Sequence, residues 1–266
     1  MNFTRHFALV LITGLRLAAQ AAPQLQGVGA AMHAIIDAQE VAGAVTLVTN
    51  KDKIMHLEAT GFADLAGKKP MAPDTMFWLA STTKPFTGVA ILMLQDAGRL
   101  NIRDPVAKYI PAFADLKPPS GTSANLTIAQ LLTHTSGLAD TPPKEYIVAT
   151  ALADFIPRRL AEPMRFEPGE RWKYASSEID VAGHIVEIVS GKSFDAFLRE
   201  RLFDPLAMKD TTFHPTKAQL MRMATCYVKD DDTGELRPQP PIWPTILRET
   251  SPPLPAGGLF STASDL

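Results

Sequence analysis

The first hundred residues alternate between helical and strand patterns of hydrophobic positions. Apolar residues recur at helical spacing within residues 27–43, which predicts a helix that ends by a glycine. Two β-rich runs, 44–49 and 53–59, then flank the polar turn residues 50–52, a pattern typical of a β-hairpin. A helix followed by a hairpin is the usual start of a layered domain of mixed α and β structure.

The most apolar helix is predicted at residues 86–94, where positions 86, 89, 90, 93 and 94 follow helical spacing and positions 91 and 92 are apolar as well. A helix that is hydrophobic on all sides is expected in the interior of a large domain. Gly98 is the expected end of this helix. Ser81 and Lys84 precede the apolar run, so we expect both at its N-terminal end.

Residues 100–225 show helical patterns joined by proline- and glycine-rich connections. Helices are predicted within 126–138, 176–191 and 193–206, and Ser177 with Asp180 predicts a capping box at the start of the second one.

The last forty residues are mostly loop by pattern. A second hairpin is predicted around Thr233 and Gly234, and seven prolines between 238 and 255 predict an extended loop over the surface. The final stretch predicts a glycine-rich loop and then a helix that begins at Ser264 and Asp265. Because two strands make a poor sheet for this much helix, we expect the C-terminal strands of the domain to be missing from this chain.

The amino-acid composition excludes few classes of function. The 266 residues are 46% hydrophobic and 20% charged, which is ordinary for a globular protein. The net charge is -2, so no basic excess points to a nucleic-acid partner. Cys226 is the single cysteine; it cannot form an internal disulfide, and we expect it to be buried or half-buried.

Residues 1–22 have the pattern of a secretory signal peptide. A cationic start is followed by a short apolar stretch and by Ala19 and Ala21, small residues in an A-x-A arrangement. The pattern predicts export, to the periplasm or out of the cell. No later segment has the roughly 18 uninterrupted apolar residues of a membrane span, so no transmembrane helix is expected.

Ser81 and Lys84 have the spacing of a nucleophile and its base. A neutral serine hydroxyl needs a base, and residues i and i+3 lie on one helix face about 5–6 Å apart at Cβ. Burial and the positive end of a helix both disfavour an ammonium ion, and the same helix end offers N–H groups to an oxyanion. The spacing alone is weak, because a chain of this length holds roughly one S-x-x-K by chance. An N-cap serine beside a surface lysine is the structural alternative.

Further segments of the chain make the Ser81–Lys84 pattern more specific than its spacing alone. Four stretches resemble, in chain order, successive regions of the serine β-lactamase-related hydrolases, a group with class C β-lactamases, DD-peptidases and β-lactamase-like carboxylesterases: FWLASTTKPFTGVAILMLQDAGRLNIRDPVAKYIPAF, LTIAQLLTHTSGL, FEPGERWKYASSEIDVAGHIVEIVSGKSFDAFLRERLFDPLAMKDTTF and PAGGLFSTASDL. S-x-x-K is a known motif of such enzymes.

The resemblance covers about residues 25–266 and implies an α/β (α+β) chain of the β-lactamase/transpeptidase-like fold. We expect an antiparallel sheet flanked by helices, plus a mostly helical domain. The predicted organisation of residues 23–266 is a sheet-side part with the nucleophile helix, a mostly helical insertion and the start of a return to the sheet, at 23–98, 99–255 and 256–266.

The resemblance also assigns roles. Ser81 is the acylated nucleophile, Lys84 its activating partner, and Tyr174 the phenol that carries the proton to and from the leaving group. The family's usual Tyr-x-Asn is here Tyr174-Ala175-Ser176, so Ser176 stands where an amide would bind the substrate. A serine offers fewer hydrogen bonds than an amide, which favours simple esters over β-lactams, although Ser176 is equally well an N-cap.

The resulting hypothesis is a serine hydrolase that forms an acyl-enzyme with small esters or amides, with a carboxylesterase-like preference. The alternatives are a β-lactamase or DD-peptidase, and a non-catalytic member that binds a peptidoglycan-like ligand. The family's third motif, a Lys/His-x-Gly strand, is expected beyond Leu266. No cofactor or metal is expected, because the six histidines lack paired ligand spacing. His134 is either a triad base or a structural turn residue; the second is favoured because S-x-x-K chemistry already has a base.

Overall fold

The computed structural model describes residues 25–239 and 250–266. The predicted signal peptide lies outside these residues, and export stays a prediction. The helices are α1 (Gln26–Asp37), α2 (Lys84–Asp96), α3 (Ile128–Leu132), α4 (Pro143–Val148), α5 (Ile156–Ala161), α6 (Ser176–Ser190), α7 (Phe194–Leu198) and α8 (Lys217–Leu220). The strands are β1 (Gly43–Thr49), β2 (Ile54–Asp64), β3 (Lys69–Pro70), β4 (Phe77–Trp78), β5 (Tyr227–Lys229), β6 (Leu236–Pro238) and β7 (Phe260–Ser261). Short 3-10 turns are η1 (Ala80–Thr83), η2 (Val106–Lys108), η3 (Pro111–Asp115) and η4 (Leu152–Phe155), and η5 (Arg199–Phe203) is a π turn.

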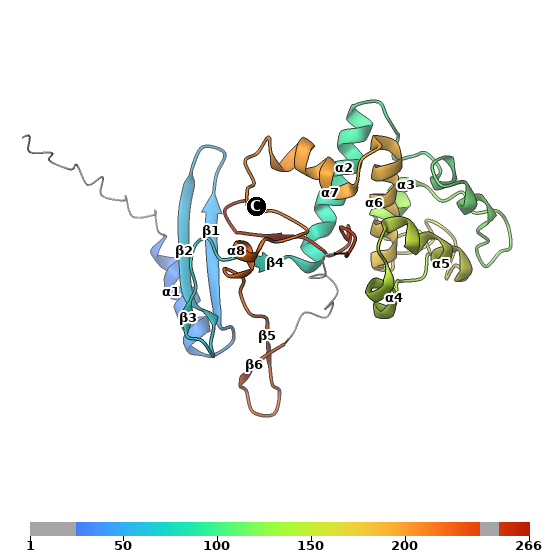
Figure 1. The fold of residues 1–266 in the computed structure, drawn as a ribbon. Coiled ribbons are helices and arrows are strands. Elements are labelled where there is room, and N and C mark those ends of the chain that lie inside the picture. Colours follow the sequence, from blue (N-terminus) through green and yellow to red (C-terminus); the bar gives the residue numbers. More distant parts are fainter. Residues whose placement is uncertain (1–24, 240–249) are drawn as a thin grey trace, which may run out of the picture.

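The predicted first helix and both hairpins are confirmed. β1 and β2 pair antiparallel with Leu47 opposite Leu57, β3 adds to the far edge of β2, and α1 packs on the hairpin (Figure 1). β2 continues to Asp64, beyond the predicted end at 59. The second hairpin is β5 with β6. The division of the chain at residues 98 and 255 stays a prediction.

A second small sheet joins distant parts of the chain. β4 pairs antiparallel with β7, with Trp78 opposite Phe260, and the Leu79 N–H donates to the Leu259 carbonyl at 2.9 Å. Strands of two residues leave no alternating pattern, which is why the sequence did not predict them. Beyond β7, residues 263–265 form a turn, and the helix predicted to begin at Ser264 stays a prediction.

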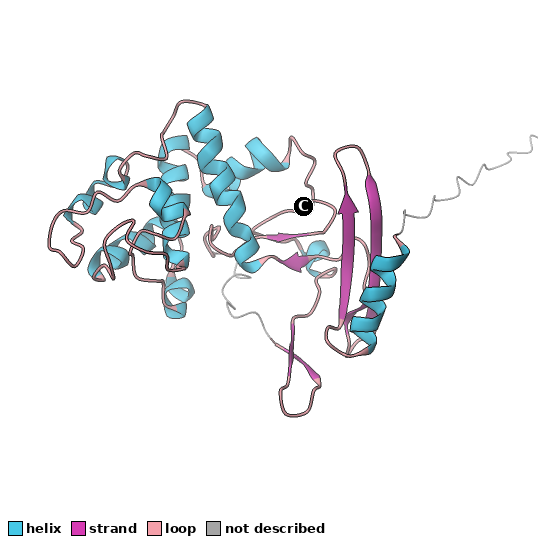
Figure 2. Ribbon diagram, turned by 180° about the vertical axis from the view of Figure 1, so that it is seen from behind, coloured by secondary structure: helices cyan, strands magenta, loops and turns pink. Residues whose placement is uncertain are grey.

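The helical part is organised around α6. This helix packs against α2, α3, α7 and η4, and its side chains Val181, Ala182, Ile185 and Val186 are fully buried. Most helices gather at the end of the molecule away from the long β1–β2 hairpin (Figure 2). The helix predicted within 193–206 is α7, which runs on into the π turn η5.

The prediction for the most apolar helix is partly wrong, because the helix forms but is not buried on all sides. α2 begins at Lys84, with Ser81 in the 3-10 turn η1 just before it, so both lie at the expected end of the helix. Its Ile91 is fully buried, but Val89 and Leu92 are 39% and 45% exposed. An all-apolar surface therefore did not guarantee burial on all sides.

The C-terminal segment is buried rather than spread over the surface. Residues 240–249 lie outside the description, but Ser251, Leu254 and Ala256 are at most 6% exposed. Pro255 lies against Gly183 of α6, and its carbonyl accepts a hydrogen bond from Thr87 of α2 at 3.0 Å. The predicted surface loop is therefore wrong for its last residues, because α2 and α6 enclose them. The predicted burial of Cys226 is also wrong, since this residue is exposed.

Gly183→Ala tests this close contact. A Cβ at this position would collide with the Pro255 ring, and overpacking of a core typically costs about 1–3 kcal/mol. Urea denaturation should show a loss of that size. Gly88→Ala on α2 is the matched control: nothing lies within 4 Å of its added Cβ, so it should stabilise the protein by roughly 0.5–1 kcal/mol through helix propensity. Equal behaviour of the two variants would contradict the packing argument.

Candidate active site

Ser81 is presented on a strained turn. Ala80, directly before it, has a φ of 45°, a left-handed conformation that is uncommon for a residue with a side chain. Such strain persists only where surrounding contacts impose it, and it clusters at functional sites. The Thr82 N–H donates to the Leu79 carbonyl at 2.9 Å, and the Trp78 indole N–H donates to the Gly257 carbonyl at 2.7 Å. These contacts hold the turn with the Ser81 side chain exposed.

The structure brings Ser81, Lys84 and Tyr174 together. The Lys84 Nζ donates to Ser81 Oγ at 3.1 Å, and the Tyr174 hydroxyl donates to the same oxygen at 2.8 Å. Lys84 Nζ also lies 4.8 Å from the centre of the Tyr174 ring. The two predicted partners thus converge on one oxygen, although Tyr174 is 93 residues away from Ser81 in sequence.

The second hydrogen bond of Lys84 goes to a backbone segment that the buried carboxyl of Asp180 holds in place. Lys84 Nζ donates to the Ala256 carbonyl at 2.7 Å. The Ala256 N–H in turn points at Asp180 Oδ1 at 3.3 Å, and the Tyr146 hydroxyl donates to Asp180 Oδ2 at 2.7 Å. Burial raises the pKa of Asp180 to about 7 and also raises that of Tyr146. Neither residue had been singled out for the site from the sequence.

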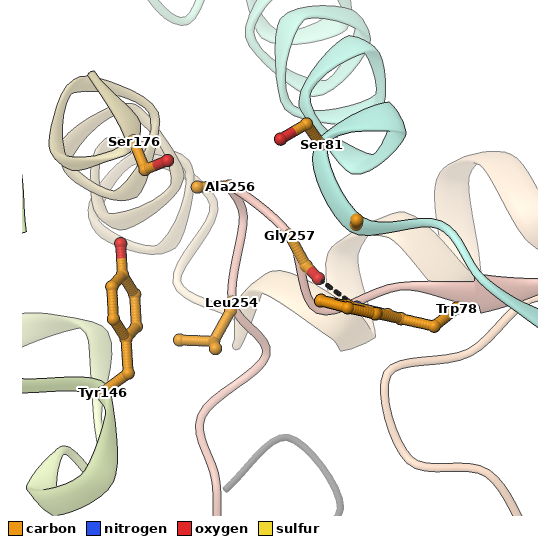
Figure 3. Close-up of a pocket in the computed structure, with 8 residues that line it drawn as sticks. Trp78, Ser81, Tyr146, Ser176, Leu254, Ala256 and Gly257 are labelled. Carbon is orange, nitrogen blue, oxygen red and sulfur yellow. Dashed lines mark hydrogen bonds between the residues drawn. The ribbon is translucent and has the colours of Figure 1, made fainter. Parts of the chain in front are cut away.

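Ser176 opens α6 and faces the cavity beside Ser81 (Figure 3). The N-cap position is Ala175, so Ser176 is not the N-cap. The free N–H groups of the helix end are satisfied from a distant loop, because Asp140 Oδ1 accepts from the N–H of Ser176 at 2.7 Å and of Ser177 at 3.3 Å.

The predicted capping box of Ser177 and Asp180 is therefore wrong. The Ser177 hydroxyl donates to the Ala139 carbonyl at 2.7 Å, and Asp180 faces Ala256 and Tyr146. Asp140, which replaces the box, lies 36 residues before Ser176, too far for a local motif to indicate.

A buried arginine holds the loop that carries Asp140. The Arg159 guanidinium, 1% exposed, donates to the carbonyls of Ala139 and Asp140 at 2.8 and 2.9 Å and to Glu145 at 2.8 Å. Removing one partner of such a buried pair leaves an uncompensated charge. Arg159 therefore joins the loop that carries Asp140 to α4, the helix that carries Glu145 and Tyr146.

The cavity beside Ser81 has a volume of about 240 Å³ (Figure 3). Its walls are mostly apolar, with few polar groups, which is the usual character of a small-molecule site. It is lined by Trp78, Ala80, Ser81, Tyr146, Ser176, Leu254, Ala256 and Gly257. Tyr174, which contacts Ser81 Oγ, is not among the lining residues.

His134 lies behind Tyr174 and is not a partner of Ser81 in the described part of the chain. Its Nδ1 is 2.6 Å from Glu178 Oε2, and its ring centre is 4.6 Å from that of Tyr174. Burial, with a further contribution from Lys84, lowers the pKa of His134. Burial raises the pKa of Glu178 to about 8. The geometry therefore disfavours the triad-base alternative for His134.

The two buried carboxyls predict how stability depends on pH. Asp180 and Glu178 have folded-state pKa values of about 7 and about 8, above their ordinary values of 3.8 and 4.5. The folded state therefore binds more protons than the unfolded state over this range, and the free energy of unfolding should fall as the pH rises from about 4 through about 8. Urea midpoints at pH 5, 7 and 9 measure this. Asp180→Asn, which has no charge to bury, should flatten the fall; an unchanged slope would contradict the assignment.

Comparison with known proteins gives the family. Residues 28–266 match the model of the Beta-lactamase family. The chain is 31% identical over 209 residues to Protein flp of Staphylococcus aureus (strain MW2), covering 77% of this chain and 42% of that protein. It is 32% identical over 260 residues to Protein Rv1367c of Mycobacterium tuberculosis (strain ATCC 25618 / H37Rv), covering 91% and 64%. The chain thus spans between 42% and 64% of the length of these relatives.

Comparison with solved structures supports the same family. EstCE1, a hydrolase with promiscuous acyltransferase activity, superposes with a TM-score of 0.80 at 25% identity, over 90% of this chain and 69% of that one. The penicillin binding protein from Bacillus halodurans gives 0.68 at 28% identity, over 88% and 69%. The class C beta lactamase from Rhodobacter sphaeroides gives 0.69 at 25% identity, over 91% and 63%. The predicted family and fold class are confirmed: the chain belongs to the Beta-lactamase family of serine hydrolases and has its β-lactamase/transpeptidase-like α+β fold.

Proposed function

We propose that this protein is a serine hydrolase that forms an acyl-enzyme on Ser81 and prefers small esters. One observation carries the proposal: Ser81 Oγ accepts hydrogen bonds from both Lys84 Nζ and the Tyr174 hydroxyl, at 3.1 and 2.8 Å. A hydroxyl with two proton-carrying partners, on a strained turn beside a cavity, is arranged as an activated nucleophile.

The proposed reaction has two halves. Ser81 Oγ attacks the ester carbonyl carbon while its proton passes to the Lys84–Tyr174 pair. The backbone N–H of Ser81 itself stabilises the oxyanion that forms on the substrate carbonyl. Tyr174 then gives its proton to the departing alcohol oxygen, and the acyl-enzyme remains. Water attacks this ester in the second half, its proton returns through the same pair, and the carboxylic acid leaves.

Two features support esters over β-lactams. Ser176 stands where an amide would otherwise bind the substrate, and its single hydroxyl offers fewer hydrogen bonds. The superposition with EstCE1 is also closer than that with the class C enzyme, by TM-scores of 0.80 and 0.69. A β-lactamase or DD-peptidase activity is the second candidate, supported by the 28% identity with a penicillin binding protein.

Ser81→Ala tests the nucleophile. An acylating probe such as a fluorophosphonate should add its mass to the peptide that contains Ser81, and the variant should lose that label. The variant should also lose about 10³-fold or more of kcat/KM for p-nitrophenyl acetate, because the covalent route is removed. Ser190→Ala, at the far end of α6, should behave as wild type.

Substrate comparison decides between the candidates. Rapid turnover of a chromogenic cephalosporin with negligible p-nitrophenyl acetate hydrolysis would replace the esterase assignment by the β-lactamase one. Ligand binding without turnover of either substrate would favour a non-catalytic member.

The cavity predicts which acyl groups are accepted. If Tyr174 protonates the leaving group, the leaving group lies on the Tyr174 side and the acyl group enters the cavity. A volume of about 240 Å³ has room for about eight water-sized groups at roughly 30 Å³ each. Hydrolysis of p-nitrophenyl esters should therefore be sustained from acetyl to roughly octanoyl and should fall about tenfold or more by dodecanoyl. Leu254→Ala, which removes an apolar wall, should move the optimum to longer chains; an unchanged profile in a folded variant would place the acyl group elsewhere.

A further inference from the structure

Three contacts tie His134 to the segment that carries Tyr174. The Lys173 N–H donates to the His134 carbonyl at 2.8 Å. The Ala175 N–H points at His134 Nδ1 at 3.4 Å. Between them, the Tyr174 ring lies on the imidazole with ring centres 4.6 Å apart and planes tilted by 40°. His134 thus holds the backbone on both sides of Tyr174 and the ring itself.

The imidazole is held in turn by a buried carboxyl. Glu178 is 1% exposed, and one of its oxygens accepts hydrogen bonds from both the N–H and the hydroxyl of Ser136. Its other oxygen is 2.6 Å from His134 Nδ1. Because Ser136 donates twice to the first oxygen, the second oxygen is the one that can carry a proton. In the short contact this proton is donated to the single lone pair of Nδ1, which the more distant Ala175 N–H also approaches, at 3.4 Å. The raised pKa of Glu178 agrees with this placement.

We propose that His134 is a positioning residue for the reaction. Through these three contacts it fixes the Tyr174 hydroxyl against Ser81, in line to protonate the leaving group, while the neutral Glu178 orients the imidazole. The inference rests on the proposed acyl-enzyme function, since it concerns the step in which the alcohol leaves.

Packing alone does not account for His134 and its surroundings. His134 has a φ of 57°, a strained conformation for a residue with a side chain. Glu178 is a buried carboxyl, which costs free energy even when it is hydrogen-bonded. An apolar residue at 178 would fill the same space without the cost of burying a carboxyl. What such a residue lacks is the proton that orients the imidazole.

Two substitutions separate the contacts of His134. His134→Phe keeps an aromatic face for Tyr174 but has no acceptor for the Ala175 N–H. His134→Asn keeps an acceptor and tolerates a positive φ, but removes the ring. His184→Asn is the matched control, because His184 also pairs through Nδ1 with a glutamate of α6, at 3.0 Å, without a contact to Tyr174. Thermal melts establish that each variant is folded.

The readout is a pair of butyrate esters. The p-nitrophenolate anion leaves without a proton, whereas ethoxide needs one, so only ethyl butyrate depends on a well-placed Tyr174. Both His134 variants should lower kcat for ethyl butyrate by about 10–10²-fold, the size of effect expected for a displaced proton donor. The loss for p-nitrophenyl butyrate should be several-fold smaller, with little change in KM. The control should match wild type on both esters. Equal losses on the two esters would overturn the inference and leave His134 a purely structural residue.

Substitutions at position 178 test the location of the proton. Glu178→Gln keeps a donor toward Nδ1 and an acceptor toward Ser136, so its ratio of ethyl to p-nitrophenyl hydrolysis should stay within about threefold of wild type. Glu178→Ala should reproduce the His134 defect. A Glu178→Gln enzyme as impaired as Glu178→Ala would contradict the neutral carboxyl.

Crystal structures separate this inference from the proposed function. If wild type hydrolyses neither ester, the proposed function fails, and the structure of His134→Asn still decides the positioning role. The Tyr174 hydroxyl displaced from Ser81 supports that role. The hydroxyl retained at the wild-type distance of 2.8 Å overturns it.

Discussion

The site depends on the chain from Leu254 to Gly257 being enclosed between α2 and α6. Four contacts hold this segment: Thr87 and Lys84 donate to its carbonyls from α2, Trp78 donates to Gly257, and its Ala256 N–H points at Asp180 of α6. Only the absence of a side chain at Gly183 allows so close an approach. The segment then forms a wall of the cavity, directs Lys84 toward Ser81 and continues into β7, which pairs with the strand that precedes the nucleophile turn.

The first turn of α6 supplies the second half of the arrangement. Ser176, Glu178 and Asp180 are spaced two apart, so they point in different directions around the helix. Ser176 faces the cavity, Glu178 the histidine behind Tyr174, and Asp180 the enclosed segment. Acidic groups near a helix N-terminus are favoured by its dipole. Their burial nevertheless raises the pKa of both carboxyls.

Local patterns predicted those parts of the site whose partners are close in sequence. The spacing of Ser81 and Lys84 predicted that they lie on one face at the start of the apolar helix. In the structure Lys84 Nζ lies 3.1 Å from Ser81 Oγ. Tyr174 had no local signal and came only from resemblance. Asp180 was predicted as part of a capping box and Glu178 had no local signal, because their burial depends on residues 256 and 134 rather than on their neighbours in sequence. The helix end at 176 is capped by Asp140 from another loop, which no local motif can encode.

The phenol beside Ser81 and the cavity beside Ser81 are built from different residues. Tyr174 and the histidine that supports it are absent from the cavity lining, whereas Tyr146 and Leu254 belong to it. Different residues hold the two tyrosines. Tyr146 is held by Asp180 and by its place in α4, which Arg159 anchors. Tyr174 is held by His134, which Glu178 orients. α6 contributes to both supports, through Asp180 toward Tyr146 and through Glu178 toward His134. In the proposed reaction, changes in the cavity can therefore alter which acyl group is accepted without disturbing how the leaving group is protonated.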